Sequence, residues 1–335
     1  MAPKLSDYQK VLKRFDALRI VVLGDLMLDE YVFGATTRIS REAPVLILKH
    51  ERTVSLPGGG ANPVSNIASL GATALPVGVL GTDRAGETLR DLFKEKGVDV
   101  GGIVGEPGRV SPVKVRVLAG DHNTARQQVI RIDHLAEHPL LPSTEKAVLS
   151  ALEARLKGAH GLIVSDYGNG LVTPAVLRFV NSLAKKMPKL VVCVDSRYQL
   201  AAYRGVTAMV PNETEAAPAA GFDDFEDSDL DKIGKRLLSR TKAKQVLITR
   251  GSRGMSLFSK AKREDVAVLG GTQIVDVNGA GDSVAACFTL ALAAGASPSI
   301  AMRLANAAGG VAVMQAGPAS VTREQILKLL KSPSK

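Results

Sequence analysis

Short apolar runs that end in a polar residue recur along this chain and alternate with helical patterns. Such runs are typical of buried parallel strands, and the segments 144–156, 174–186 and 228–239 carry apolar residues at helical spacing. The alternation predicts an α/β fold with a doubly wound, mainly parallel sheet flanked by helices. Ligands of such sheets bind beyond the carboxyl ends of the strands, so a site is expected near the polar ends of several runs: Asp25, Asp166, Asp195, Asn212 and Arg250.

Two regions break this alternation. Residues 31–56 and 111–134 place apolar and polar side chains with a period of two and contain turn residues. This pattern predicts antiparallel strands that form a small second sheet. A sheet of this kind needs a cover for its other face, so it could close over a ligand or pair with a second subunit.

The charge of the chain leaves several partners open. Its 335 residues carry a net charge of +10, and basic chains bind nucleic acid, anionic membrane surfaces or phosphorylated small molecules. The basic residues are scattered, aromatic residues make up 4% and tryptophan is absent, which disfavours platforms that stack bases. A solvated surface is therefore the first interpretation of the charge and phosphate ligands are the next, and no nucleic-acid partner is expected.

The cysteines and the apolar segments predict a cytoplasmic protein without a membrane anchor. The two cysteines, Cys193 and Cys287, lie in apolar runs and do not form a disulfide framework. The amino-terminal residues lack the apolar centre of a signal peptide. The longest nearly apolar stretch, 284–296, is too short to span a bilayer and is typical of a core helix.

The stretch DVNGAGD (276–282) predicts an anion-binding turn. Its glycines allow backbone N–H groups to approach a ligand, and the helix that follows adds unpaired N–H groups at the positive end of its dipole. Asp282 would lie in the first helical turn. There it could act as a general base for a hydroxyl that attacks a phosphate, or it could simply cap the helix or complement its dipole.

A glycine run precedes another predicted helix in PGGGANPVSNIASLGA (57–72). Asn62 before Pro63 is typical of a helix N-cap followed by the first helical residue, and Gly71 is typical of a helix end. Three consecutive glycines exceed what a cap needs and favour a backbone pressed against a ligand. The signature of a P-loop is absent from the sequence.

Two further stretches have two interpretations each. Asn212 and Glu215 in VPNETE are three residues apart, so they could hold magnesium through water or form a reciprocal capping box. Gly251 and Gly254 in TRGSRGM follow a predicted strand, where they could admit a nucleotide or form a hairpin turn.

The order of PGGGAN, PNETE, TRGSRG and DVNGAGD resembles that of the PfkB or ribokinase-like family of ATP-dependent carbohydrate kinases over nearly the whole chain. GDLMLDEYVFGATTRISREAPV, QQVIRID and SDYGNG resemble the branch that phosphorylates D-glycero-β-D-manno-heptose 7-phosphate. The resemblance implies a single ribokinase-like kinase domain over residues 1–335, with a β-sheet lid formed by about 31–56 and 111–134. Because the nucleotidyltransferase domain of bifunctional members is absent, a free-standing kinase is expected.

The resemblance also implies roles for individual residues. Asp282 corresponds to the catalytic base, and the anion hole comprises Asn278, Gly279, Ala280 and Gly281. Asn212 and Glu215 correspond to the residues that organise Mg²⁺ and the phosphates. The nucleotide would be bound by Asn212, Thr249, Gly251, Gly254 and Asn306. A monovalent cation such as K⁺ would be bound by Asp276 and the 317–320 loop. The positions that contact the sugar or its phosphate are Asp25, Asp29, Gly59, Gly60, Asn62, Arg131, Asp166 and Arg197.

The expected reaction is transfer of the γ-phosphate of ATP to the anomeric hydroxyl of the heptose 7-phosphate, and the lid implies a homodimer. Three positions depart from the branch: Asn169 replaces a lysine, Ser196 a proline, and Arg41 a proline. A kinase of another sugar, sugar phosphate or nucleoside is therefore an alternative. A sugar or nucleotide sensor without turnover is an alternative of a different class.

Overall fold

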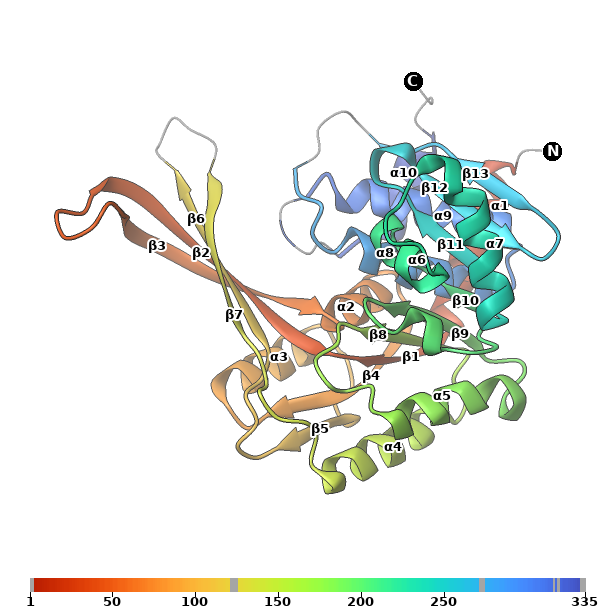
Figure 1. The fold of residues 1–335 in the computed structure, drawn as a ribbon, viewed down its shortest axis with the longest axis horizontal. Helices are drawn as coiled ribbons and strands as arrows, with labels where there is room; N and C mark the ends of the chain where they lie inside the picture. Colours follow the sequence, from red (N-terminus) through yellow and green to blue (C-terminus); the bar gives the residue numbers. More distant parts are fainter. Residues whose placement is uncertain (1–2, 121–125, 271–274, 316, 318–319, 332–335) are drawn as a thin grey trace.

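A mainly parallel sheet forms the centre of the molecule (Figure 1). The computed structural model describes residues 3–120, 126–270, 275–315, 317 and 320–331. Within these ranges the sheet has nine strands in the order β13-β12-β11-β10-β9-β8-β1-β4-β5, of which β12 and β13 are antiparallel to their neighbours. The bounds are β1 (Arg19–Gly24), β4 (Thr73–Gly81), β5 (Ile103–Glu106), β8 (Gly161–Asp166), β9 (Val191–Ser196), β10 (Ala208–Met209), β11 (Gln245–Thr249), β12 (Met255–Ser259) and β13 (Arg263–Val266).

Helices cover both faces of this sheet and bury one apolar core on each. Along β1, Ile20 and Val22 face one core while Val21 and Leu23 face the other, as the alternation of side chains across a strand requires. The first core is covered by α1 (Leu5–Lys13), α2 (Ala61–Ser69), α3 (Arg84–Glu95), α8 (Ala280–Ala293), α9 (Pro298–Ala312) and α10 (Arg323–Lys331). The second is covered by α4 (Pro142–Leu156), α5 (Pro174–Lys186), α6 (Glu213–Ala220) and α7 (Leu230–Thr241).

A separate sheet projects from the body as a lid (Figure 1). Its described part has four strands in the order β3-β2-β6-β7: β2 (Leu26–Ile39), β3 (Leu46–Gly59), β6 (Val113–Gly120) and β7 (Gln127–His134). The hairpins β2–β3 and β6–β7 are antiparallel, as the period of two predicts, whereas β2 and β6 pair in parallel. The predicted lid segment 111–134 includes residues 121–125, which lie outside the described residues.

The strands and helices predicted from apolar runs are confirmed, with small shifts at their ends. The patterns did not identify β4, in which Pro76 and Gly78 interrupt an otherwise apolar run. Both residue types are depleted in strands, so the run resembles a loop in sequence. Among the described residues, no helix is both long and apolar enough to cross a membrane.

Candidate active site

Asp282 lies at the point where the carboxyl end of the sheet, the lid and α8 meet. Gly279 is the N-cap of α8 with a φ of 75°, so the turn before the helix uses a conformation that favours glycine. Asp282 occupies the first helical turn, as predicted, but its side chain does not cap the helix. Its Oδ2 accepts a hydrogen bond from Asn62 Nδ2 at 3.0 Å and its Oδ1 accepts one from the hydroxyl of Tyr167 at 3.0 Å.

Burial governs the protonation of this carboxyl. The Asp282 residue is 4% exposed, and loss of solvation raises its pKa to about 7. The hydrogen bonds from Asn62 and Tyr167 oppose this rise because they stabilise the ionised form. A carboxyl with a pKa near neutrality is suited to accept a proton at physiological pH.

Asn62 is not the helix N-cap that its position before Pro63 predicted. The helix α2 begins at Ala61 with Gly60 as its N-cap, so Asn62 lies inside the first turn and is fully buried. Its amide donates to Asp282 and to the backbone carbonyl of Gly279. The cap interpretation was wrong because a contact across the fold, which local spacing cannot reveal, determines the position of this side chain.

The glycine run 58–60 packs against the protein itself. A Cβ atom at Gly60 would lie 2.8 Å from the backbone nitrogen of Asp25, and one at Gly58 would overlap the carboxylate of Asp29. Gly59 has a φ of 49° and faces the side chain of Met27. The absence of side chains therefore lets the base of β3 approach β1 and β2 closely, and it keeps two predicted sugar-site carboxylates beside the run.

The carboxylates of the predicted sugar-site residues Asp25 and Asp166 accept hydrogen bonds from backbone and side-chain groups of the protein. Asp25 accepts from the N–H groups of Tyr167, Asn169 and Leu171, at 2.8, 3.1 and 3.3 Å, and burial raises its pKa to about 6. The carboxylate of Asp166 accepts from Ser196 Oγ at 2.7 Å and from the Tyr203 hydroxyl at 3.1 Å. Both carboxylates therefore fix the loops that follow β8 and β9.

The lid brings cations to this site, of which the sequence singled out Arg131 but neither Arg116 nor Lys114. Arg116 on β6 forms a buried ion pair with Asp29, with 2.8 Å between Nη1 and Oδ1. Lys114, two residues earlier, lies over the ring of Tyr167, and its partial burial lowers its pKa. Arg131 on β7 is paired in register with Arg116, so it shares their face of the lid, although it is half exposed and ion-paired with Asp133.

A largely apolar cavity of about 560 Å³ lies on the other side of the α8 turn. Thr249, Gly251, Gly254 and Asn306 all line it, as the resemblance implied for a nucleotide pocket. The glycines also form the hairpin between β11 and β12, through η4 (Gly251–Arg253), so their two interpretations are compatible. The remaining walls come from the start of α8 and from the 268–270 segment, and include Ala280, Gly281, Val284, Val268 and Leu269.

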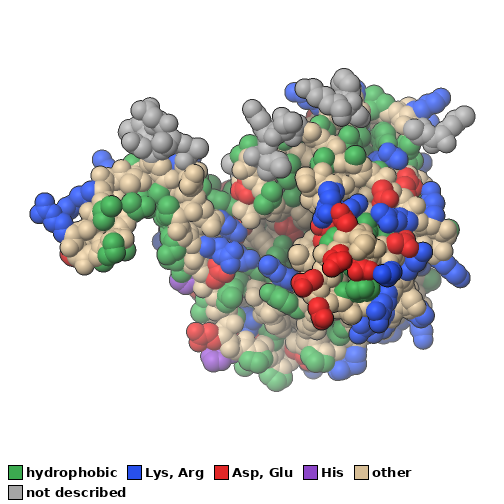
Figure 2. Space-filling model, turned by 45° about the horizontal axis from the view of Figure 1, so that its top comes forward, with side chains coloured by type: hydrophobic (Ala, Val, Ile, Leu, Met, Phe, Trp, Pro, Cys, Tyr) green, Lys and Arg blue, Asp and Glu red, His purple; other side chains and the backbone are tan. Residues whose placement is uncertain are grey.

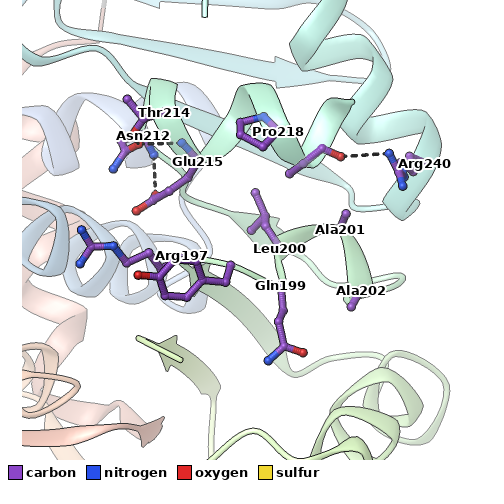
Figure 3. A pocket seen from close by; sticks show the side chains of 12 residues that line it. Arg197, Gln199, Leu200, Ala201, Ala202, Asn212, Thr214, Glu215, Pro218 and Arg240 are labelled. Carbon is purple, nitrogen blue, oxygen red and sulfur yellow. Dashed lines mark hydrogen bonds between the residues drawn. The ribbon is translucent and has the colours of Figure 1, made fainter. Parts of the chain in front are cut away.

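A second cavity, of about 810 Å³, adjoins the first because Asn212 and Thr214 line both (Figure 3). Asn212 and Glu215 form the reciprocal capping box of α6: Asn212 Oδ1 accepts from the Glu215 N–H, and Glu215 Oε2 accepts from the Asn212 N–H. Arg197 lines the same cavity, and its charge acts on Glu215. Burial raises the pKa of Glu215 despite these contacts.

Asp195, near the end of β9, was among the polar strand ends where the sequence predicted a site, but the resemblance gave it no individual role. Burial raises its pKa well above the ordinary value, and the charges of Glu215, Asp282 and Asp166 raise it further. Among the described residues no three acidic, histidine or cysteine side chains are close enough to hold a metal ion directly. The carboxylates of Asp195, Glu215, Asp282 and Asp166 nonetheless repel one another, and a bound cation would reduce this repulsion.

Asp276 ends up beside the anion-hole turn with both oxygens engaged. Its Oδ1 accepts from the N–H of Asn278 at 2.9 Å, and its Oδ2 accepts from the N–H of Gly317 at 3.0 Å. The predicted cation loop 317–320 includes residues 318 and 319, which lie outside the described residues. The first contact fixes the turn that leads into α8.

The architecture of main sheet and lid is shared with solved sugar-kinase structures. Phosphofructokinase-2 from Escherichia coli in complex with substrates and products matches with a TM-score of 0.76 at 20% identity, covering 93% of this chain and 97% of that chain. Arabidopsis thaliana ribokinase complexed with ribose and ATP matches with a TM-score of 0.71 at 23% identity, covering 94% and 99%. The fold is therefore ribokinase-like, as predicted.

Residues 17–325 match the model of the pfkB family carbohydrate kinases, and the chain belongs to this family. The members of this family are carbohydrate kinases, which transfer phosphate to an alcohol group.

Curated relatives cover nearly all of the chain. The bifunctional protein HldE of Mesorhizobium japonicum is 36% identical over 324 residues, which are 97% of this chain and 64% of the relative. The bifunctional protein HldE of Caulobacter vibrioides is 37% identical over 315 residues, which are 94% and 64%. The chain thus spans about 64% of the length of these relatives.

The raised pKa of Asp282 predicts a dependence of stability on pH. Because the folded-state pKa of about 7 exceeds the ordinary value of 3.8, the stability contributed by this group is fully present only below the ordinary value and is lost progressively as the pH rises to 7. Asp282→Asn removes this loss. In thermal unfolding experiments, we expect the stability of the variant relative to the wild type to rise by on the order of 2 kcal/mol between pH 5 and pH 8.

Asp224→Asn provides the control for this experiment, because it makes the same chemical change at an exposed position. A shift for Asp282→Asn that is the same at pH 5 and pH 8 would show that burial does not control the ionisation of Asp282.

Proposed function

We propose that this chain is an ATP-dependent sugar kinase that phosphorylates the anomeric hydroxyl of D-glycero-β-D-manno-heptose 7-phosphate to give the 1,7-bisphosphate. The observation that carries the proposal is the buried carboxyl of Asp282, with a pKa of about 7, between a nucleotide-sized cavity and the lid. The pfkB membership and the HldE relatives support the reaction type and the substrate branch.

In this proposal Asp282 takes the proton of the attacking hydroxyl. The base then becomes a neutral carboxylic acid, the form that its buried surroundings favour. The backbone N–H groups of Gly279 and Gly281 would face the charge that develops on the transferred group, at the positive end of the α8 dipole, while the N–H of Ala280 donates to the carbonyl of Val277 at 3.4 Å. A Cβ at Gly281 would meet no atom within 4 Å, so the space beside this turn is open to a phosphate.

The cavity suits a nucleotide in size and lining. Its volume of about 560 Å³ lies in the range of small-ligand pockets, and apolar walls with a few polar groups suit a base and ribose. Bound ATP would supply the phosphoryl group, and its Mg²⁺ would neutralise part of the phosphate charge. Because Mg²⁺ keeps several of its waters, Glu215, Asn212 and the nearby Asp195 would hold it through water, and their clustered negative charge favours such an ion.

The lid cations favour a phosphorylated sugar. Arg116 is neutralised by Asp29 and Arg131 is paired with Asp133, whereas Lys114 forms no ion pair with any of the described residues. Lys114 is thus the cation best placed on this face to meet a second phosphate, with Arg131 beside it and Arg197 as a candidate from the body. Asp29, Asn62 and the 58–60 backbone would then contact the sugar ring.

A kinase of another sugar, sugar phosphate or nucleoside is the second candidate, and Asn169 favours it. This residue stands where the heptose branch carries a lysine, and its side chain contacts Met27 Sδ at 3.8 Å. The silent sensor is a weaker candidate because Asp282 and its glycine turn are complete.

A monovalent cation near Asp276 is proposed by analogy with phosphofructokinase-2 in complex with potassium. A cytoplasmic location stays a prediction.

Turnover of a panel of substrates tests the function. ATP consumption and product mass would be measured with Mg²⁺ and the heptose 7-phosphate, fructose, ribose, fructose 6-phosphate or adenosine. We expect a heptose bisphosphate in strong preference, and a loss of kcat of about 10²- to 10⁴-fold in Asp282→Asn, as for other general bases.

Three other results are informative. Preferred turnover of a different substrate would overturn the heptose assignment and leave the kinase mechanism intact. An Asp282→Asn enzyme within about tenfold of wild type would refute the general-base role. A lack of turnover with every substrate, despite nucleotide binding, would favour the sensor.

Lys114→Ala tests the phosphate contact. Loss of a charge-assisted hydrogen bond to the substrate phosphate should raise KM for the heptose 7-phosphate by roughly 10- to 100-fold, while KM for ATP stays unchanged. The matched control is Lys49→Ala, which removes an exposed lysine of the same lid, on β3. Equal effects of the two substitutions on KM would show that Lys114 does not contact the substrate.

We also propose that the lid pairs with that of a second copy of this chain. Figure 2 shows hydrophobic side chains gathered on the lid arm. On β7, Val129, Ile130 and Ile132 are 46, 52 and 45% exposed, which is unusual for an unpartnered strand at the edge of a sheet. Sedimentation velocity should give a dimer that Ile130→Lys weakens. A wild-type monomer at micromolar concentration would contradict this proposal.

A further inference from the structure

Tyr167 links the loop after β8 to the proposed base. Its hydroxyl lies 3.0 Å from Asp282 Oδ1, and the two residues are 115 positions apart in the chain. Burial and the charge of Asp282 raise the pKa of the Tyr167 phenol well above its usual value, so the hydroxyl keeps its proton and acts as a donor. The other oxygen of the carboxylate accepts from Asn62, and both donors lie on elements other than α8.

We propose that Tyr167 is a positioning residue that holds the carboxylate of Asp282 in its catalytic orientation and sets its basicity. This inference rests on the proposed kinase function. The Tyr167 hydroxyl and the Asn62 amide donate to different oxygens of the carboxylate, which fixes the rotation of its plane. Each oxygen keeps a further lone pair, so the substrate hydroxyl can still transfer its proton to Asp282 while Tyr167 retains its own.

Tyr167 is itself held from two sides. Its backbone N–H donates to Asp25 Oδ2 at 2.8 Å, and two further N–H groups of the same loop donate to the same carboxylate. The lid residue Lys114 places its Nζ 5.2 Å from the centre of the Tyr167 ring, within the range of a cation–π contact. The orientation of the base is therefore determined by the body and the lid together.

Four titratable groups act on Asp282 from the elements around it. Tyr167 from the loop after β8 and Lys114 from β6 favour the ionised form of Asp282, whereas Asp29 from β2 disfavours it. The charges of Asp282 and of Asp195 from β9 repel each other. Of these four described groups, Tyr167 is the one that donates a hydrogen bond to the carboxylate of Asp282. Removing its hydroxyl alone should therefore change the basicity of Asp282 without altering the charges nearby.

Tyr167→Phe tests the inference because it keeps the ring under Lys114 and removes only the O–H. Without this donor the ionised carboxylate is less stable, so the acid limb of the pH profile of kcat/KM should move upward by roughly one to two pH units. At pH 7 kcat should fall by roughly tenfold or more, with KM for ATP unchanged. The part of the loss in kcat that persists on the high-pH plateau measures the effect on orientation.

Tyr203→Phe is the matched control. Tyr203 is fully buried, and its hydroxyl donates to Asp166 at 3.1 Å, so the substitution removes the same group from a neighbouring carboxylate. We expect the acid limb of this variant to stay at the wild-type position even if its stability falls. A similar upward shift in both variants would show a general structural effect and would overturn the proposal.

A titration that does not depend on turnover separates this inference from the proposed function. The carboxyl carbon of Asp282 can be observed by ¹³C NMR in protein labelled at aspartate, with its resonance assigned by its loss in Asp282→Asn. Tyr167→Phe should raise the midpoint of this resonance whether or not any sugar is phosphorylated. An unchanged midpoint together with an unchanged pH profile would refute the role of Tyr167. A shifted midpoint in a protein without turnover would refute only the kinase function.

Discussion

The arrangement of this molecule depends on one buried carboxylate that is held by residues far apart in the chain. Asn62 is 220 residues from Asp282 and Tyr167 is 115, yet both donate to it. An unpaired charge in such a place would be very costly, so the two donors, the helix that starts beside it and the close contact of the 58–60 backbone must form together. The fold of the carboxyl edge of the sheet can be understood as the set of contacts that makes this burial possible.

The surroundings of Asp282 divide into a mostly apolar side, with Glu213 as its charged residue among those that line the cavity, and a side with many charges. Toward the nucleotide-sized cavity the walls are mostly apolar, and the polar contacts come from backbone and small side chains. Toward the lid, the charges of Asp29, Lys114 and Arg116 act on one another, and toward the strands β8 and β9 the charges of Glu215 and Asp166 act on Asp195. A site with this division can hold a largely apolar group on one side and a multiply charged one on the other, as expected where a nucleotide and a sugar phosphate meet.

Much of this could be predicted from the sequence, because strands with two buried faces and helices with one apolar stripe leave periodic patterns. The polar strand ends, the place of Asp282 in the first turn of α8 and the glycines of the β11–β12 hairpin follow from local patterns. The contact of Tyr167 with Asp282 does not, since it depends on how β8 is placed beside α8. Asn62 was misassigned for the same reason. The lid cations Lys114 and Arg116 lie on a common face by alternation, but alternation does not tell which face meets the body.

The strand β3 runs without interruption from the tip of the lid to Gly59, and α2 begins at Ala61, so only Gly60 separates the lid from the helix that carries Asn62. Gly60 packs against the backbone of Gly24 and Asp25, which leaves this joint little freedom to absorb a rotation. The lid strand β3 and α2 are thus joined by a short and tightly packed connection. In the proposed kinase, a swing of the lid over the cleft would therefore move the Asn62 amide that donates to Asp282, so that closure and alignment of the proposed base would occur together.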